Sequence, residues 1–227
     1  MAVILPASSR RNTPLTQHAT SVKAPQPRDR EQVRALFKAV FGHRLETLYV
    51  VAVTTGLWQG ALLGLPWEDV GLEAGMVQVR RTLSEARSGR TFEAPKSGKG
   101  RQIRLTRKAT KALRAHRRAQ LEKCRKLEGL WQDQGLVFPP QVGTPLSARN
   151  LIRTFKAHLS RAALPATTRF HDLRYTCATL LLRQGVNPKF VQELLGHADV
   201  SLTLNVHSHV LPDMGDATAG AMEDALE

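Results

Sequence analysis

The chain has 227 residues, 42% of them hydrophobic, and its 33 Lys and Arg against 19 Asp and Glu give a formal net charge of +14. This length is enough to bury one full core. Two cysteines, Cys124 and Cys177, are too few and too far apart for a disulfide framework or a paired-cysteine zinc site. The apolar run 2–5 is too short for a signal peptide or a membrane span, so we expect a soluble cytoplasmic protein built around one domain.

The first third of the chain is expected to be helical after an irregular start. Residues 1–29 are rich in Ser, Thr, Pro and Arg, a composition typical of a flexible arm or linker. The apolar pattern that follows predicts three helices, at about 31–40, 45–56 and 60–65.

The middle of the chain combines strands with two longer helices. Strand-like alternation predicts a small β-sheet from about 76–82, 91–94 and 101–105. A long basic helix is predicted at 107–126. A further helix at 147–162 carries Leu151, Phe155 and Leu159 at i, i+4 spacing, which places an apolar face toward the core.

Three short helices are predicted near the C-terminus, at about 172–184, 188–195 and 201–207. Asn187 followed by Pro188 is typical of an N-cap and a first helical residue, and Gly185 and Gly196 stand where left-handed helix ends are expected. The tail from residue 211 onward contains acidic residues and no Lys or Arg. Its last helix, predicted at 216–226, has alanines on one stripe and is not expected to contact a polyanion.

Positive charge is concentrated in one block, because residues 80–126 hold seventeen Lys and Arg against three Glu. Such a block can be the solvated face of a helix, here 107–126, or a surface that contacts nucleic-acid phosphates. In the second interpretation, the expected DNA-backbone contacts are Arg80, Arg81, Lys99, Arg101, Arg104, Arg107 and Lys108.

Side chains able to contact phosphate gather in the short C-terminal helices: His171, Arg174, His197 and His207. His171 and Arg174 are spaced i, i+3 and therefore share a helix face. We expect both side chains to point outward toward solvent, while Leu173 points into the core. A zinc site built from the histidines is a less favoured alternative, because His207 and His209 fall on different helix faces.

The run 170–209 carries HDLRYT, LGH and TLNVHSH in that order, and it resembles the C-terminal half of the tyrosine recombinase (phage integrase) catalytic domain. The resemblance implies that His171 and Arg174 match the second histidine and second arginine of the family's active site, and that His197 matches its third basic position. The nucleophilic tyrosine of the family would fall at position 207, where this chain has His207.

Two earlier segments extend the resemblance. TTGLWQGALLGLPWEDV, residues 54–70, is similar to the segment that delivers the first catalytic arginine of the family, but Trp58 stands at the arginine position, and Ala61 and Pro66 replace a glutamate and an arginine. The stretch APKSGK, residues 94–99, resembles the family's β-hairpin lysine, which makes Lys96 the match.

The resemblance assigns roles in a metal-independent cleavage that needs no cofactor. Arg174 would hold a non-bridging phosphate oxygen, His171 would assist proton transfer, His197 would donate to the phosphate, and Lys96 would protonate the leaving 5′ oxygen. Singly, each residue has an ordinary structural interpretation, such as a helix-start histidine or a turn lysine. Their occurrence in family order favours one shared site.

Neither tyrosine of the chain is a good substitute for the missing nucleophile. Tyr175 is expected to point away from the site, and Tyr49 lies in an apolar helix.

From about residue 30 to 212, the resemblance implies a mainly α-helical domain with a small antiparallel β-sheet, the tyrosine recombinase catalytic-domain fold. Residues 1–29 would be the end of a missing N-terminal DNA-clamping domain. Residues 213–227 would form a tail helix that docks on a neighbouring subunit, either a second copy or another recombinase.

We therefore expect a DNA-binding, integrase-like protein of site-specific recombination or integration, associated with the nucleoid and cleavage-deficient because of Trp58 and His207. The expected partner is duplex DNA. Two alternatives remain: an active metal-independent strand transferase that uses His207, and a non-catalytic regulatory or assembly partner of active recombinases.

Overall fold

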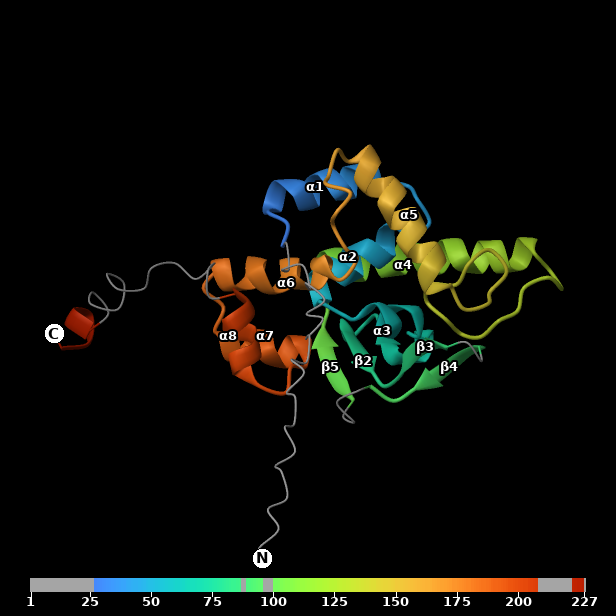
Figure 1. The fold of residues 1–227 in the computed structure, drawn as a ribbon. Coiled ribbons are helices and arrows are strands. Elements are labelled where there is room, and N and C mark those ends of the chain that lie inside the picture. The colour runs from blue at the N-terminus through green and yellow to red at the C-terminus, as the bar shows by residue number, and fades with distance from the viewer. Residues whose placement is uncertain (1–26, 87–88, 96–99, 208–221, 227) are drawn as a thin grey trace, which may run out of the picture.

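A computed structural model of the chain describes residues 27–86, 89–95, 100–207 and 222–226, with only the backbone described at 202 and 205–207 (Figure 1). The expected arm at 1–26 and most of the tail, 208–221, lie outside the described residues. At the C-terminus the described residues 222–226 are helical and exposed, within the helix predicted at 216–226.

Three helices open the described chain, close to the predicted positions. Helix α1, Arg30–Ala39, begins with a capping box in which Asp29 Oδ1 accepts from the Gln32 backbone N–H at 2.7 Å. Helix α2, Glu46–Thr55, is buried on almost every side and ends at Gly56, whose φ of 62° is left-handed. Helix α3, Gln59–Leu63, follows at once with Trp58 as its N-cap.

The strands form two small antiparallel sheets, and the expectation of one sheet was wrong. After the short 3-10 turn Trp67–Asp69, β1 (Val70–Gly71), β2 (Met76–Val79) and β5 (Arg101–Arg104) make a three-stranded sheet in the order β1-β2-β5. Strands β3 (Thr82–Ala86) and β4 (Gly89–Glu93) form a separate hairpin.

The predicted strand 76–82 is broken at Arg80 and Arg81 because the chain turns there to pack β3 on helix α3. Arg81 Nε donates to the Gly64 carbonyl at 3.0 Å. A Cβ at Gly64 would lie 2.8 Å from the Leu83 backbone nitrogen, so the helix and the strand approach closely only because residue 64 is glycine. The alternation of residue types alone did not reveal this turn.

The two longer helices occupy the predicted ranges. Helix α4, Arg107–Lys126, is capped by Thr106, whose hydroxyl accepts from the Ala109 backbone N–H at 3.2 Å. Helix α5, Ala148–Arg161, follows Ser147 and buries Leu151, Phe155 and Leu159 as its spacing predicts. Both helices contribute to the core around α2, and α4 runs behind α2 in Figure 1.

Three short helices complete the described fold: α6 (Asp172–Arg183), α7 (Pro188–Leu195) and α8 (Val200–His207). Asn187 caps α7 by accepting from the Lys189 backbone N–H, and Gly185 and Gly196 have φ values of 74° and 71°, as predicted. A small satellite core joins α6 to α7 through Ala178, Leu182, Val191 and Leu195.

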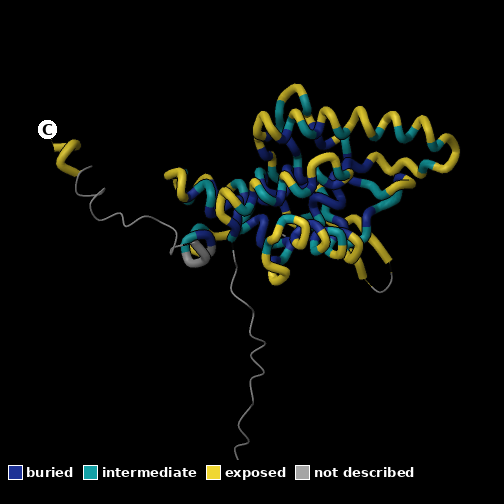
Figure 2. The backbone as a smooth tube through the Cα atoms, turned by 90° about the horizontal axis from the view of Figure 1, so that it is seen from above, coloured by how far each residue is buried: buried dark blue, intermediate teal, exposed yellow. Residues whose placement is uncertain are grey.

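Helix α2 is the centre of the molecule, because α4 and α6 both pack against it and most of its residues are buried. Figure 2 shows buried residues through the middle and exposed residues on the outer turns of the helices. The fold is therefore mainly α-helical with a small antiparallel β portion, as the sequence predicts, although the strands form two sheets instead of one. Within the described part of the chain, no helix combines the length and the apolar character that a membrane crossing requires.

Candidate active site

An aromatic and basic stack joins the start of α3 to the start of α6. The Trp58 ring lies 4.5 Å from the His171 ring, with 26° between their planes, and the Arg174 Cζ lies 4.7 Å from the centroid of the same indole. Trp58 therefore contacts both groups that the sequence predicts to bind phosphate. It keeps 48% of its surface exposed, so it forms the outer layer of the stack.

Arg174 is buried, with 3% of its surface exposed, so the expectation that it is held out toward solvent was wrong. Its Nη1 donates to the Gly56 carbonyl at 2.7 Å, and its Nη2 donates to the Leu195 carbonyl at 2.8 Å. These two acceptors close α2 and α7, and their orphan carbonyls attract a cation at a helix C-terminus. Burial and the neighbouring Arg101 lower the pKa of Arg174 to about 10.

His171 is the N-cap of α6, and its half-buried imidazole lies between two aromatic rings. The Tyr175 ring meets the His171 ring edge-on, with 4.9 Å between the ring centroids. Tyr175 therefore points toward the site, contrary to the prediction. Burial, and then the charge of Arg174, lower the pKa of His171 to about 4. The imidazole is therefore neutral at pH 7, and its lowered pKa makes it a weak base.

His197 follows the left-handed residue Gly196 at the end of α7. Its Nδ1 lies 2.8 Å from the Thr203 hydroxyl on α8, and its backbone carbonyl accepts from Gln192 Nε2 at 2.7 Å. These contacts fix the direction of the imidazole. Sequence reasoning did not identify Thr203, because only the fold brings α8 beside the α7 end.

A cavity of about 380 Å³ opens beside these groups. Trp58, Ala61 and His197 line it together with the start of β3, the residues after β4, and Arg101 at the start of β5. The structure therefore brings Arg101, expected only as a DNA-backbone contact, into the same site as Trp58, Arg174 and His197. No sequence pattern indicated the direction of its side chain.

Three expected site residues have no described side chain to compare with this geometry. Lys96 lies outside the described residues, and so does Lys99. His207 is the last residue of α8, where only the backbone is described.

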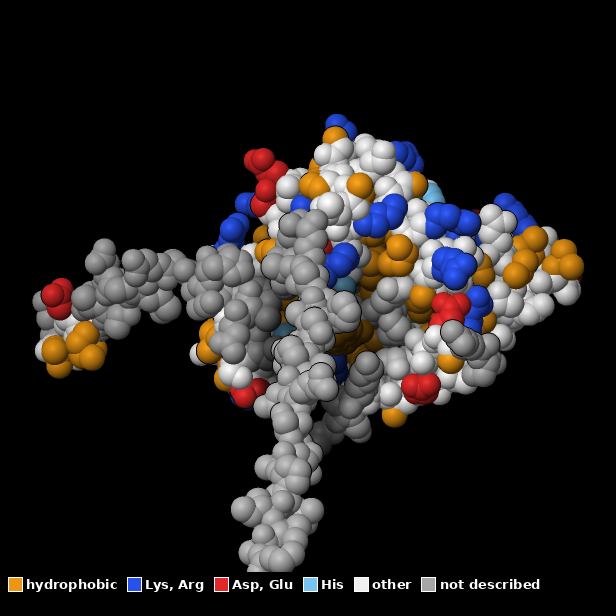
Figure 3. All heavy atoms as spheres, in the orientation of Figure 1, with side chains coloured by type: hydrophobic (Ala, Val, Ile, Leu, Met, Phe, Trp, Pro, Cys, Tyr) orange, Lys and Arg blue, Asp and Glu red, His pale blue; other side chains and the backbone are white. Residues whose placement is uncertain are grey.

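The other basic residues expected at DNA are distributed over different surfaces. Arg80 lies 3.4 Å from Asp69, Arg81 lies over the Phe92 ring, and Lys108 Nζ lies 4.3 Å from the Phe37 ring centroid. Arg104 and Arg107 are exposed at the other end of β5. In Figure 3, Lys and Arg side chains gather over α5 and beside the β3–β4 hairpin.

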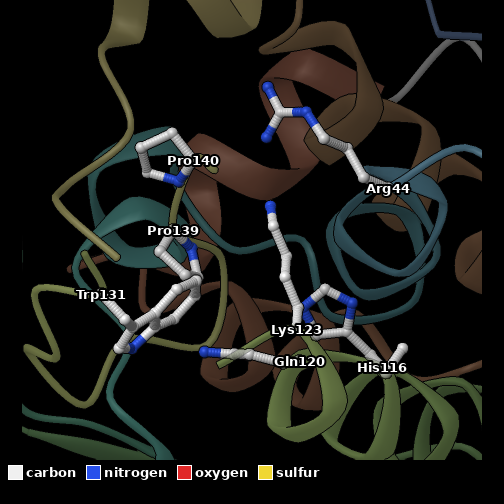
Figure 4. A pocket seen from close by; sticks show the side chains of 8 residues that line it. Arg44, His116, Gln120, Lys123, Trp131, Pro139 and Pro140 are labelled. Atoms are coloured by element: carbon white, nitrogen blue, oxygen red, sulfur yellow. The ribbon is translucent and has the colours of Figure 1, made fainter. Parts of the chain in front are cut away.

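A second, smaller cavity of about 130 Å³ lies between α4 and the loop that follows it (Figure 4). Arg44, Lys123 and Trp131 line it, and it shares no residue with the cavity beside Trp58. Among the described side chains, no group of three or more His, Cys, Asp or Glu is arranged to hold a metal ion.

Comparison with known proteins gives one consistent family. Residues 29–213 match the phage integrase family. The chain is 35% identical over 195 residues to the tyrosine recombinase XerC-like protein of Caldanaerobacter subterraneus subsp. tengcongensis, covering 80% of this chain and 50% of that protein. It is 28% identical over 220 residues to the putative defective protein IntQ of Escherichia coli K12, covering 89% of this chain and 54% of that protein.

Among solved structures, the Tn1549 transposon integrase in complex with a circular intermediate DNA superposes with a TM-score of 0.75 at 23% identity, over 90% of this chain and 67% of that one. The chain spans about half the length of the curated relatives it matches. Because the family match runs from the start of α1 past the end of α8, and the fold agrees with it, the chain belongs to the phage integrase family of tyrosine recombinases and has their catalytic-domain fold.

Proposed function

We propose that this chain binds duplex DNA in site-specific recombination or integration, at the nucleoid. We also propose that the protein with its present sequence does not cleave DNA. The observation that supports this most directly is the position of Trp58. Its indole lies against both His171 and Arg174, where the family pattern calls for an arginine. An uncharged ring therefore stands at one of the positions where the family pattern calls for a phosphate-binding cation.

Tryptophan in place of arginine at position 58 should slow DNA cleavage strongly. An arginine that clamps phosphate in other phosphoryl-transfer sites contributes about 10³–10⁵ in rate, on the order of 4–7 kcal/mol. Trp offers one indole N–H and no charge. Position 207 has histidine where the family has its tyrosine nucleophile, and an imidazole is shorter and aimed differently from a phenol.

The remaining groups suit phosphate binding and proton transfer. Arg174 carries the charge next to the cavity. His171 is the proposed proton-transfer group by resemblance, although its lowered pKa makes its neutral imidazole a weak base. His197 is held by Thr203 beside the same cavity, where it can donate to a phosphate oxygen. Lys96 is the proposed proton donor to the leaving group, by resemblance alone.

Net charge and relatives support DNA as the partner. The formal net charge is +14, and phosphate contacts by Lys and Arg supply most of the sequence-independent affinity for DNA. The solved Tn1549 integrase is a DNA complex.

Salt dependence of duplex binding tests this partner. The logarithm of the association constant should fall linearly with the logarithm of salt concentration, with a slope of about −0.9 per phosphate contacted. Arg104→Gln on the exposed end of β5 should make the slope shallower by about one, whereas Arg183→Gln at the end of α6 should leave it unchanged. A flat salt response in the unmodified protein would exclude a phosphate-based interface.

A second candidate function is that of a non-catalytic assembly partner of active recombinases. Met222 and Leu226 of the C-terminal helical turn are 59% and 80% exposed, which leaves apolar side chains available to another subunit. The acidic composition of this tail does not suit a DNA surface, whereas it does suit a protein partner.

A further inference from the structure

Arg101 has a position that its assignment to the DNA-backbone surface does not explain. It begins β5 opposite Val79 of β2, and its side chain crosses the cavity wall to reach the end of α7. A Cβ added at Gly196 would overlap Arg101 Nη1 and would lie 3.0 Å from Arg101 Cζ. The guanidinium therefore lies directly against the glycine that precedes His197.

Two donors of this guanidinium are unsatisfied. The Arg101 Nε and Nη2 atoms are buried and have no hydrogen-bond partner among the described residues. In an arginine these two nitrogens form the side edge of the guanidinium, whose parallel N–H bonds match two oxygens of a carboxylate or phosphate. Nη1, at the other edge, is the atom that lies against Gly196.

The surroundings do not neutralise this cation. No described ion pair includes Arg101, and burial lowers its pKa. Its charge also contributes to lowering the pKa of Arg174, so the two guanidinium groups repel each other across the site. Glu93 is the acidic residue on the cavity wall, but it is exposed and its Oε1 accepts from the Thr91 hydroxyl at 3.1 Å.

A buried cation without a partner is costly, and an anion that reaches it restores both its charge balance and its hydrogen bonds. The cavity of about 380 Å³ provides the space, and His197 lines it as a further donor. We propose that Arg101 is a phosphate-binding residue of this site, which grips two phosphate oxygens through Nε and Nη2 and supplies a second guanidinium beside Arg174 where Trp58 has removed one.

This inference rests on the proposed function, because the phosphate would be a DNA phosphodiester. It differs from the known family pattern in placing the second positive charge on β5 instead of at position 58. Gly196 then has two purposes: it takes the left-handed φ of 71° that ends α7, and it leaves room for the guanidinium.

Inorganic phosphate tests the site without DNA. Thermal unfolding would be measured for the unmodified protein, Arg101→Gln, Arg101→Lys and Arg183→Gln, in sodium phosphate and in sodium chloride of equal ionic strength. Arg183 is the control, since it is exposed at the end of α6 and lies outside the proposed DNA surface. We expect phosphate to raise the Tm of the unmodified protein and of Arg183→Gln by about 2–4 °C.

The response of Arg101→Gln decides the proposal. Its Tm in chloride should equal or exceed that of the unmodified protein, because an unpaired buried cation has been removed. The rise in its Tm caused by phosphate should be less than half of the rise seen in the unmodified protein. If Arg101→Gln does not fold, Arg101→Lys carries the test: it keeps the charge but not the two-pronged edge, so its phosphate shift should be smaller than that of Arg183→Gln. An undiminished shift in the variant that folds, or no shift in the unmodified protein, would overturn the proposal.

Duplex DNA provides the second arm of the experiment. If the proposed function is wrong, DNA binding should not depend on salt concentration, regardless of how phosphate changes the Tm. Failure of the Arg101 proposal alone appears as normal salt-dependent DNA binding combined with a phosphate response that does not depend on residue 101.

Discussion

Trp58 and Arg174 lie in contact at the centre of the candidate site. The indole covers the guanidinium on one side, and the Gly56 and Leu195 carbonyls hold two of its nitrogens. The spacing of His171 and Arg174 predicted that the two side chains share a helix face, and both contact Trp58, but the spacing did not predict that Arg174 is buried. Helical periodicity gives the direction of a side chain relative to its own helix, and the ends of α2 and α7 that enclose it come from elsewhere in the chain.

Arg174 should be important for stability as well as for phosphate binding. Arg174→Met keeps the length of the side chain but leaves two buried carbonyls without donors, so we expect the free energy of unfolding to fall by about 2–4 kcal/mol. Urea denaturation measures this change. Arg153→Met on the exposed face of α5 is the control and should stay within about 0.5 kcal/mol of the unmodified protein. Equal stability of the two variants would show that the carbonyl contacts contribute little.

At the scale of elements, caps and apolar periodicity predicted every described helix from α1 to α8, because these signals are local. The break at Arg80 and Arg81 was not predicted. It depends on the contact of Gly64 with Leu83, which joins a helix to a strand and leaves no local pattern in the sequence.

The C-terminal tail is an element with a separable role. Deleting residues 213–227 should leave the domain folded and able to bind DNA, because the described helical turn 222–226 is exposed throughout and the tail is acidic. Self-association, or assembly with an active recombinase, should decrease, as measured by sedimentation velocity. Loss of folding in the truncated protein would show that the tail packs on its own domain instead.

For the whole molecule, buried histidines make stability depend on pH. The pKa of His171 and the pKa of His158 are both lowered to about 4, in each case mainly by burial. His158 Nδ1 lies 3.1 Å from the Tyr49 hydroxyl, deep in the core. In the unfolded chain the histidine pKa values are near 6.5. Between about pH 4 and pH 6.5, the unfolded chain therefore binds more protons than the folded chain does.

Stability should accordingly be complete above about pH 6.5 and should fall as the pH drops toward 4. Urea midpoints measured across this range test the expectation. His158→Gln keeps a polar group near Tyr49 but does not titrate, so its stability should fall less steeply with decreasing pH. A parallel pH profile for this variant would mean that other groups cause the loss.

Packing across the whole molecule also explains why part of the site could not be predicted from the sequence. The order of the motifs is a property of the chain, and it identified Trp58, His171, Arg174 and His197 as neighbours. The contact of Arg101 with Gly196 joins β5 to the end of α7, ninety-five positions apart in the sequence. The predicted roles of Gly196 as a helix end and of Arg101 as a DNA contact gave no sign that the two residues meet. Only the packing of the sheet against the short helices brings them together.

A covalent-adduct assay on a suicide DNA substrate tests most directly whether Trp58 and His207 disable an otherwise intact recombinase site. The unmodified protein should form no adduct, with or without added metal. Trp58→Arg alone lacks the nucleophile and His207→Tyr alone leaves Arg174 covered by the indole, so each should give little, because groups that act as a unit are not additive. The double variant should form a detectable 3′-phosphotyrosyl adduct. An acid-labile adduct of the unmodified protein that maps to His207 would contradict this, since histidine would then be the nucleophile of a working enzyme.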